Sequence, residues 1–187
     1  MPEAGVPGRD AGLTTPEWVG IDGVDYRRVV LCFLFRDSDS DSDGHGGRQV
    51  LLGLKRTRFG AGRVVALGGK IDGRETAREA AVREVEEESG IALVPTEVRA
   101  AGTITWRFPA QPAWNMAASL FTAEAGCAIA VPCEEIEPRW YGVGAIPWQE
   151  MWQDAPHWVP TVLAGRPVHA RFVMAADNES VAGAVVD

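Results

Sequence analysis

The chain has 187 residues, 46% of them hydrophobic, which is enough to bury one sizeable core but too few for two ordinary enzyme domains. Its formal net charge of −8 offers no basic surface for a phosphate backbone, so a nucleic-acid polymer is not an expected partner. The longest apolar run, residues 29–35, is too short to span a bilayer, and we expect no membrane segment.

Residues 1–17 are rich in Gly, Pro and charge, which predicts a disordered tail that carries no signal peptide. The three cysteines, Cys32, Cys127 and Cys133, are odd in number, and the first lies in an apolar run typical of a buried residue. These features indicate a reducing, cytoplasmic compartment. The sequence gives no indication of an oligomeric state.

Two short runs, VVLCFLF at 29–35 and QVLLGLK at 49–55, predict a pair of strands. Between them, residues 37–47 are acidic and low in complexity, and we expect them to form a flexible loop.

The same loop contains Asp39, Asp41, Asp43 and Gly44, which match the opening of a calcium-binding loop. Position twelve of such a loop would be Val50, where a glutamate is needed to close the site. A solvated acidic linker is therefore the stronger interpretation, and calcium binding is the alternative.

The remaining elements favour an α/β fold in which one sheet is covered by two helices. We expect a single domain at residues 18–175, followed by a loose C-terminal tail at 176–187. The expected strands lie at 98–108, 116–124 and 168–175, and helical spacing predicts a helix within 147–164.

A further helix is predicted over Ala77–Ser89. Thr76 and Glu79 have the spacing of a capping box, in which each side chain caps a backbone N–H of the first turn. Gly90 follows the last residue with helical periodicity and is a typical C-terminal cap.

This helix has three carboxylates on one face. At about 100° per residue, Glu84, Glu87 and Glu88 fall within one sector, whereas Glu86 points to nearly the opposite side. A solvated surface rich in ion pairs is the alternative, but Glu84 and Glu88 are like charges four residues apart, which destabilises a helix unless a cation lies between them. Hard oxygen ligands select Mg²⁺ or Mn²⁺, so the pattern predicts a metal site, with Glu88 facing solvent.

Arg83 lies one turn before Glu87 and is expected to hold a carboxylate by a charge-assisted hydrogen bond. An ordinary surface ion pair is the alternative. Ahead of the helix, the Gly68-Gly69 turn has no bulky side chains, so its backbone can approach a metal or phosphate closely.

These residues together resemble the Nudix box at every defined position: Gly69, five residues, Glu75, seven residues, then REVEEESGI at 83–91. The resemblance implies a Nudix-type α/β/α sandwich with a mixed sheet, and a hydrolase that cuts a phosphate–phosphate bond in a nucleoside diphosphate linked to another group, X. It implies that the metal, Mg²⁺ with Mn²⁺ as an alternative, is bound by Glu84, Glu87, Glu88 and the Gly68 carbonyl. Glu75 and Arg83 would support these ligands, and one of the carboxylates or Glu135 would take the proton from water.

The segments at 51–63 and 134–160 also resemble the MutT-homologue branch, whose members hydrolyse oxidised purine nucleoside triphosphates. That resemblance implies a set of substrate-binding residues: Lys55, Phe59, Trp106, Phe108, Trp152 and Asp154. Plain core packing of the aromatics, and a turn-capping role for Asp154, are the alternatives. The branch's pocket asparagine and second aspartate are replaced by Val65 and Ala155, which removes two polar base contacts.

The sequence therefore predicts a metal-dependent pyrophosphohydrolase that converts nucleoside triphosphates, with oxidised purines as candidates, into the monophosphate and pyrophosphate. The alternatives are hydrolysis of another substrate of the family, such as ADP-ribose, a nucleotide sugar or a dinucleoside polyphosphate, and a non-catalytic nucleotide-binding module.

Overall fold

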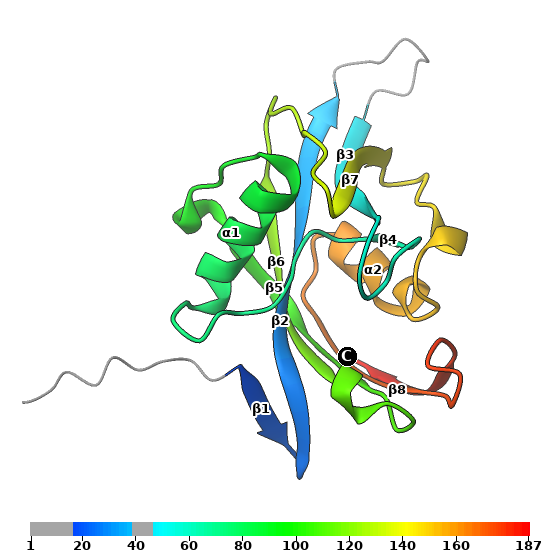
Figure 1. Ribbon diagram of the computed structural model, residues 1–187. Helices are drawn as coiled ribbons and strands as arrows, with labels where there is room; N and C mark the ends of the chain where they lie inside the picture. The colour runs from blue at the N-terminus through cyan, green and yellow to red at the C-terminus, as the bar shows by residue number, and fades with distance from the viewer. Residues whose placement is uncertain (1–16, 39–46) are drawn as a thin grey trace, which may run out of the picture.

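The computed structural model describes residues 17–38 and 47–187, and within them the chain forms a nine-stranded mixed sheet with two α-helices (Figure 1). The strands are β1 (Trp18–Ile21), β2 (Val24–Ser38), β3 (Gly47–Lys55), β4 (Val64–Val65), β5 (Arg99–Arg107), β6 (Met116–Glu124), β7 (Ile136–Gly142), β8 (Val168–Met174) and β9 (Val181–Val186). The helices are α1 (Ala77–Ser89) and α2 (Ala155–Leu163), with short 3-10 turns η1 (Pro95–Glu97), η2 (Pro112–Trp114) and η3 (Trp148–Glu150).

The strand order is β4-β3-β2-β6-β5-β8-β9, with β1 paired to β2 and β7 paired to β3. The pairs β2–β6 and β5–β8 are parallel, and the other pairs are antiparallel. The predicted strand pair at 29–35 and 49–55 is confirmed, because β2 and β3 pair antiparallel with Leu34 opposite Leu51.

Alternation along β2 divides the core into two layers. Val30, Cys32 and Leu34 pack with the residues of α1 on one face, whereas Phe33 and Phe35 pack with those of α2 on the other. Figure 1 shows the two helices on opposite sides of the sheet. The α/β/α architecture predicted from the sequence is therefore confirmed. Cys32 is fully buried as predicted, and burial raises the pKa of its thiol to about 12.

Helix α1 begins and ends as its sequence predicts. The side chain of Thr76 accepts a hydrogen bond from the backbone N–H of Glu79, and the Glu79 carboxylate accepts one in return from the N–H of Thr76. Gly90 closes the helix in the left-handed conformation, with φ of 70°. The capping fixes where the acidic face of α1 starts, and hence which turn of the helix carries it.

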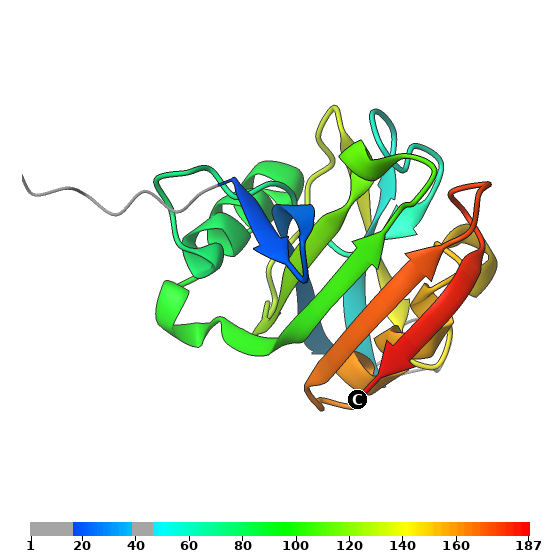
Figure 2. The same cartoon turned by 90° about the horizontal axis from the view of Figure 1, so that it is seen from below.

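The C-terminal segment differs from the prediction. Residues 176–187 are not a loose tail, because β9 pairs antiparallel with β8 and forms an outer edge of the sheet (Figure 2). Its small residues, VAGAVV, show little hydrophobic alternation, so the pattern alone does not mark it as a strand.

Two predictions fall outside the described residues: nearly all of the tail predicted at 1–17, and the acidic loop at 39–46 with its calcium-binding alternative. Among the residues that the structure does describe, no helix is long and apolar enough to cross a membrane.

Candidate active site

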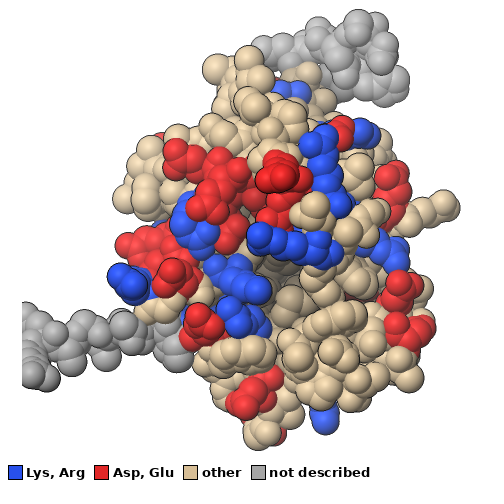
Figure 3. All heavy atoms as spheres, in the orientation of Figure 1, with Lys and Arg blue, Asp and Glu red and all other residues tan. Residues whose placement is uncertain are grey.

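A cleft of about 690 Å³ opens between the two helices, over the α2-facing side of β2. On this face of the molecule, acidic and basic side chains surround the hollow and tan surface extends from it on one side (Figure 3). One end, here named the charged end, is lined by Lys55, Arg58, Gly68, Gly69, Lys70, Arg83, Glu84, Glu87 and Glu135. The other, the aromatic end, is lined by Phe59, Trp106, Phe108, Trp114, Trp152, Asp154 and Trp158.

Arg83 organises the charged end. Its guanidinium donates hydrogen bonds to Glu75 at 2.6 and 3.1 Å, to Glu84 at 2.9 Å and to Glu87 at 3.2 Å. It also donates to the backbone carbonyl of Lys70 at 3.1 Å. One cation thus joins the acidic face of α1 to the loop ahead of it, which is more than a surface ion pair would do.

Glu88 lies deeper than the sequence predicts. The residue is only 4% exposed, and its Oε2 accepts a hydrogen bond from the N–H of Gly68 at 2.8 Å. Its other oxygen lies 4.0 Å from Nζ of Lys55. Burial raises its pKa to about 8, partly offset by the Gly68 hydrogen bond. The expectation of a solvent-facing Glu88 was wrong, because the 68–69 loop closes over this turn of the helix.

The two glycines of that loop are required by close packing. The carbonyls of Leu67 and Gly69 accept hydrogen bonds from Cys32 and Val30 of β2, which draws the loop against the strand. At Gly68 a Cβ atom would overlap the backbone of Val30, and at Gly69 it would overlap the carboxylate of Glu84. The Glu84 carboxylate therefore rests directly on the loop backbone, as a Cβ-free position allows.

Glu135 reaches the charged end from the loop before β7. It pairs with Nζ of Lys55 at 2.8 Å and with Arg58 at 3.3 Å. The hydrogen bond from Lys55 lowers the pKa of Glu135 below its usual value. Antiparallel pairing of β3 with β7 brings these residues together, although they lie 80 positions apart.

The chemistry of this end fits a hard divalent cation. Burial raises the pKa of Glu84 as well as that of Glu88, and the charges of Glu87 and Glu135 add to the effect on Glu84. Such oxygen-rich surroundings match Mg²⁺ or Mn²⁺. Among the described residues, however, no three acidic, histidine or cysteine side chains converge as a ligand set, and the carboxylates are engaged by Arg83 and by the N–H of Gly68. Binding would require them to rotate.

At the aromatic end, ring stacking connects three separate loops. Phe59 stacks on Trp152 with centroids 5.2 Å apart and packs edge-on against Trp114 at 5.0 Å. Phe108 contacts both Phe59 and Trp114. Trp114 was not predicted as a site residue, because it stands alone in a turn sequence, QPAWN, that has no periodic pattern.

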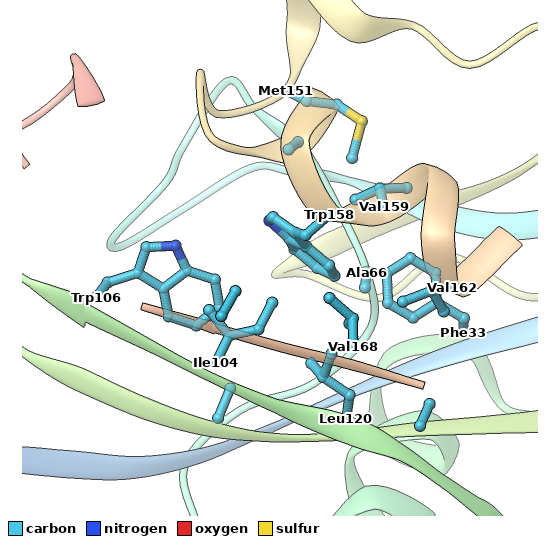
Figure 4. Packing of buried hydrophobic residues seen from close by; sticks show 14 of the residues in the cluster. Phe33, Ala66, Ile104, Trp106, Leu120, Met151, Trp158, Val159, Val162 and Val168 are labelled. Carbon is cyan, nitrogen blue, oxygen red and sulfur yellow. The ribbon is translucent and has the colours of Figure 1, made fainter. Parts of the chain in front are cut away.

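Asp154 is buried beneath this end and holds two indoles. Its Oδ2 accepts hydrogen bonds from Nε1 of Trp106 at 2.7 Å and from Nε1 of Trp158 at 2.8 Å. Figure 4 shows the two rings entering one cluster, Trp106 from β5 and Trp158 from α2. Burial raises the pKa of Asp154 despite these bonds. The side chain makes no capping bond at the start of α2, so the turn-capping alternative was wrong.

The cleft is lined by the predicted site residues, with the exception of Glu88. The two residues that replace polar groups of the MutT-homologue pattern, Val65 and Ala155, also line the cleft. Glu88 lies behind Gly68 and reaches the cleft only through its contacts with Gly68 and Lys55.

Comparison with known proteins identifies the family to which this fold belongs. A family model described as the NUDIX domain matches residues 25–162. The oxidized purine nucleoside triphosphate hydrolase of Mus musculus is 34% identical over 125 residues, which is 67% of this chain and 78% of the relative. The protein of the same name from Danio rerio is 34% identical over 115 residues, covering 62% and 72% of the two chains.

Solved structures agree on the fold. A MutT protein from Bacillus halodurans superposes with a TM-score of 0.60 at 24% identity, covering 86% of this chain and 97% of that one. The NUDIX domain of NrtR from Shewanella oneidensis, solved with ADP ribose, has a TM-score of 0.51 at 17% identity and covers 64% and 74%.

Proposed function

The chain belongs to the Nudix family of hydrolases, and from that premise we propose that it is a magnesium-dependent pyrophosphohydrolase of nucleoside triphosphates, with oxidised purine nucleotides as the leading substrates. Water attacks a phosphorus of the triphosphate, the bond to the bridging oxygen breaks, and the nucleoside monophosphate and pyrophosphate leave. Manganese is an alternative to magnesium, because both ions prefer oxygen ligands.

One observation carries this proposal: a single cleft has carboxylates and cations at one end and an aromatic pocket at the other. Phosphates suit the charged end, and a purine suits rings such as Phe59 and Trp152, against which it can stack. The relatives named as oxidized purine nucleoside triphosphate hydrolases support the same assignment.

In this proposal Glu84, Glu87, Glu88 and the Gly68 carbonyl would hold the metal. A bound divalent ion lowers the pKa of its water and neutralises charge on the phosphate oxygens. Arg83 holds Glu75, Glu84 and Glu87 in place through its fork of hydrogen bonds. Lys55 lies between Glu88 and Glu135, where it can meet a phosphate oxygen.

The proton of the attacking water passes to a carboxylate of α1 or to Glu135. The hydrogen bond from Lys55 lowers the pKa of Glu135. Glu135 is therefore ionised and able to accept a proton, but it is a weaker base than an ordinary glutamate. On α1, burial raises the pKa of Glu84 and of Glu88, which makes these two carboxylates stronger bases.

At the other end, Trp106, Phe108, Trp152 and Phe59 form the walls of the base pocket, and Asp154 is its buried acceptor. Val65 and Ala155 favour a second candidate function within the family, because their apolar side chains give no polar contact to an oxidised base. ADP-ribose, nucleotide sugars and dinucleoside polyphosphates are the substrates of that alternative. A non-catalytic nucleotide-binding module is disfavoured by the complete set of carboxylates.

We assign one Nudix domain to residues 18–175 and extend its sheet through β9. Three free thiols support a reducing compartment such as the cytoplasm.

The proposal is tested by measuring phosphate and pyrophosphate release, with magnesium, from normal and oxidised purine triphosphates, ADP-ribose, nucleotide sugars and dinucleoside polyphosphates. Pyrophosphate release from an oxidised purine triphosphate, abolished by a chelator and restored by magnesium, is the expected result. Preference for another compound of the panel would select the alternative substrate class, and binding without turnover of any compound would favour the non-catalytic module.

A further inference from the structure

Arg27 lies in the cleft but is absent from the site predicted by sequence. Alternate positions of β2 are occupied by Arg27, Val29, Leu31 and Phe33, and all four residues line the cleft. They therefore share the face of the sheet that carries the aromatic end.

The register of the sheet places Arg27 beside the base pocket. Arg27 is paired with Met116 on β6, and Met116 is paired with Trp106 on β5. Neighbouring strands are about 4.8 Å apart, so Arg27 and the Trp106 wall are two strand spacings from each other. Turn η2, which carries Trp114, packs against the same strand β2. Arg27 thus lies near the aromatic end of the cleft.

The guanidinium of Arg27 has an unused donor. Its Nη2 pairs with Glu17 at 3.0 Å, and its charge lies 5.4 Å from the ring centroid of Trp18. Its Nε is buried and has no hydrogen-bond partner among the described residues. A buried N–H group without an acceptor is destabilising, and such groups are rare unless a ligand or water satisfies them.

We propose that Arg27 is a specificity-determining residue whose Nε–H donates a hydrogen bond to an acceptor oxygen on the nucleoside part of the substrate. The inference rests on the proposed function, since it assumes a nucleotide in the cleft. The acceptor is either a base carbonyl or a ribose hydroxyl. Val65 and Ala155 are apolar, whereas Arg27 and Asp154 are charged residues of the cleft lining, one a donor and the other an acceptor.

The test compares variants of Arg27 in steady-state kinetics and in direct binding of nucleoside monophosphates by calorimetry. Arg27→Gln should raise KM and Kd roughly ten- to a hundredfold, the range expected when one buried donor is lost, with little change in kcat. Arg27→Lys should not restore affinity, because lysine keeps the charge but has no N–H at the Nε position.

Two control variants distinguish a contact between Arg27 and the nucleotide from a purely structural role of Arg27. Glu17→Gln removes the partner of Arg27 but leaves its Nε, so KM should stay within about twofold of the wild type. Arg171→Gln removes an exposed arginine that pairs with Asp22 at 3.5 Å, and it should be silent. Equal KM effects in Glu17→Gln and Arg27→Gln would reduce Arg27 to a role in the β1–β2 hairpin and overturn the inference.

Substrate pairs identify the acceptor. If it is a base carbonyl, Arg27→Gln should erase the preference between guanine and adenine nucleotides; if it is a ribose hydroxyl, the variant should erase the preference between ribo- and deoxyribonucleotides. Unchanged preferences in both pairs overturn the inference while turnover in the wild type preserves the proposed function. Absence of turnover in the wild type would contradict the proposed function. The calorimetric comparison of the wild type with Arg27→Gln would then still decide the role of Arg27. Absence of binding to both proteins would overturn the inference about Arg27.

Discussion

At the charged end of the cleft, one arginine gathers three carboxylates that lie within thirteen residues of one another, from Glu75 to Glu87. At the aromatic end, one aspartate gathers two indoles that lie 48 and 4 residues away, on β5 and α2. Both ends use a buried or half-buried charge as the hub of a hydrogen-bond network. They differ in how far along the chain the network reaches.

That difference predicts two kinds of mutational response. A change at the charged end disturbs groups on one helix and one loop, so it should alter catalysis and leave the core intact. At the aromatic end, loss of the contacts between β5 and α2 should alter both ligand affinity and stability, whereas loss of Trp152, which lies outside both elements, should alter affinity alone. The following substitutions test that separation, in order of decreasing effect.

Glu88→Gln should produce the largest effect. Gln keeps an oxygen for the N–H of Gly68 but removes the anion proposed to bind metal, so kcat should fall by about 10³-fold or more, because metal binding contributes several kcal/mol. The melting temperature should stay near that of the wild type. Glu86→Gln on the exposed side of α1 is the matched control and should be silent. Wild-type turnover in Glu88→Gln would remove Glu88 from the metal site.

Gly69→Ala should have the next largest effect. Its Cβ would overlap the Glu84 carboxylate, which is the end of a flexible side chain and can move away at little cost to stability. Misplacing a catalytic group by about 1 Å costs roughly a hundredfold in rate, so kcat should fall by that order. Gly144→Ala is the matched control, since no atom lies within 4 Å of its added Cβ. A large drop in melting temperature, with kcat unchanged, would show that the loop serves the core instead.

The charged end could be predicted from sequence because its information is local. The capping box, the helical spacing of the carboxylates and the Gly-rich turn all lie between residues 68 and 90, and short-range geometry converts that spacing into a shared face. The depth of Glu88 was missed, since it depends on hydrogen bonds between the 67–69 segment and β2, more than 30 residues away. Arg58 was also missed, as a partner of Glu135.

The aromatic end could be predicted only in part. Resemblance to a known branch identified Trp106, Phe108 and Trp152 as site residues, but the sequence does not show that Asp154 accepts hydrogen bonds from two indoles, nor that Arg27 lines the same cleft. The hydrogen bond between Asp154 and Trp106 requires the packing of α2 against the sheet. The position of Arg27 relative to Trp106 arises from the pairings β2–β6 and β6–β5, whose register no local pattern specifies. The strand β9 was missed for a related reason, because it is ordered by pairing with β8 rather than by its own hydrophobicity.

Trp152→Leu should have a moderate effect confined to binding. Trp152 stacks on Phe59 and has the guanidinium of Arg63 5.2 Å from its centroid, so its loss opens the wall against which a base would stack. Stacking of a base on an aromatic ring contributes roughly 1–3 kcal/mol, so KM should rise by about tenfold, with kcat nearly unchanged. Trp140→Leu, at a similarly half-buried tryptophan outside the cleft, should leave KM unchanged. A fall in kcat alone would place Trp152 at the reacting phosphates and not at the base.

Asp154→Asn should have the smallest effect on stability and the most selective effect on substrate. Burial raises the pKa of Asp154 above its value in the unfolded chain, so the wild type is stabilised at acidic pH and loses that contribution as pH rises through the raised pKa. Asparagine is neutral at every pH and can still accept from both indoles, so its melting temperature at neutral pH should equal or exceed that of the wild type. Asp154→Ala leaves two indole N–H groups unpaired and should be less stable by about 1–3 kcal/mol.

Because asparagine also replaces the second carboxylate oxygen by a donor, Asp154→Asn should change the ratio of kcat/KM between bases that donate and bases that accept at that position. Thermal unfolding from acidic to neutral pH, together with kcat/KM on both kinds of base, measures the two effects. A melting temperature as low as that of Asp154→Ala would mean that the negative charge itself, and not an acceptor oxygen, holds β5 and α2 together.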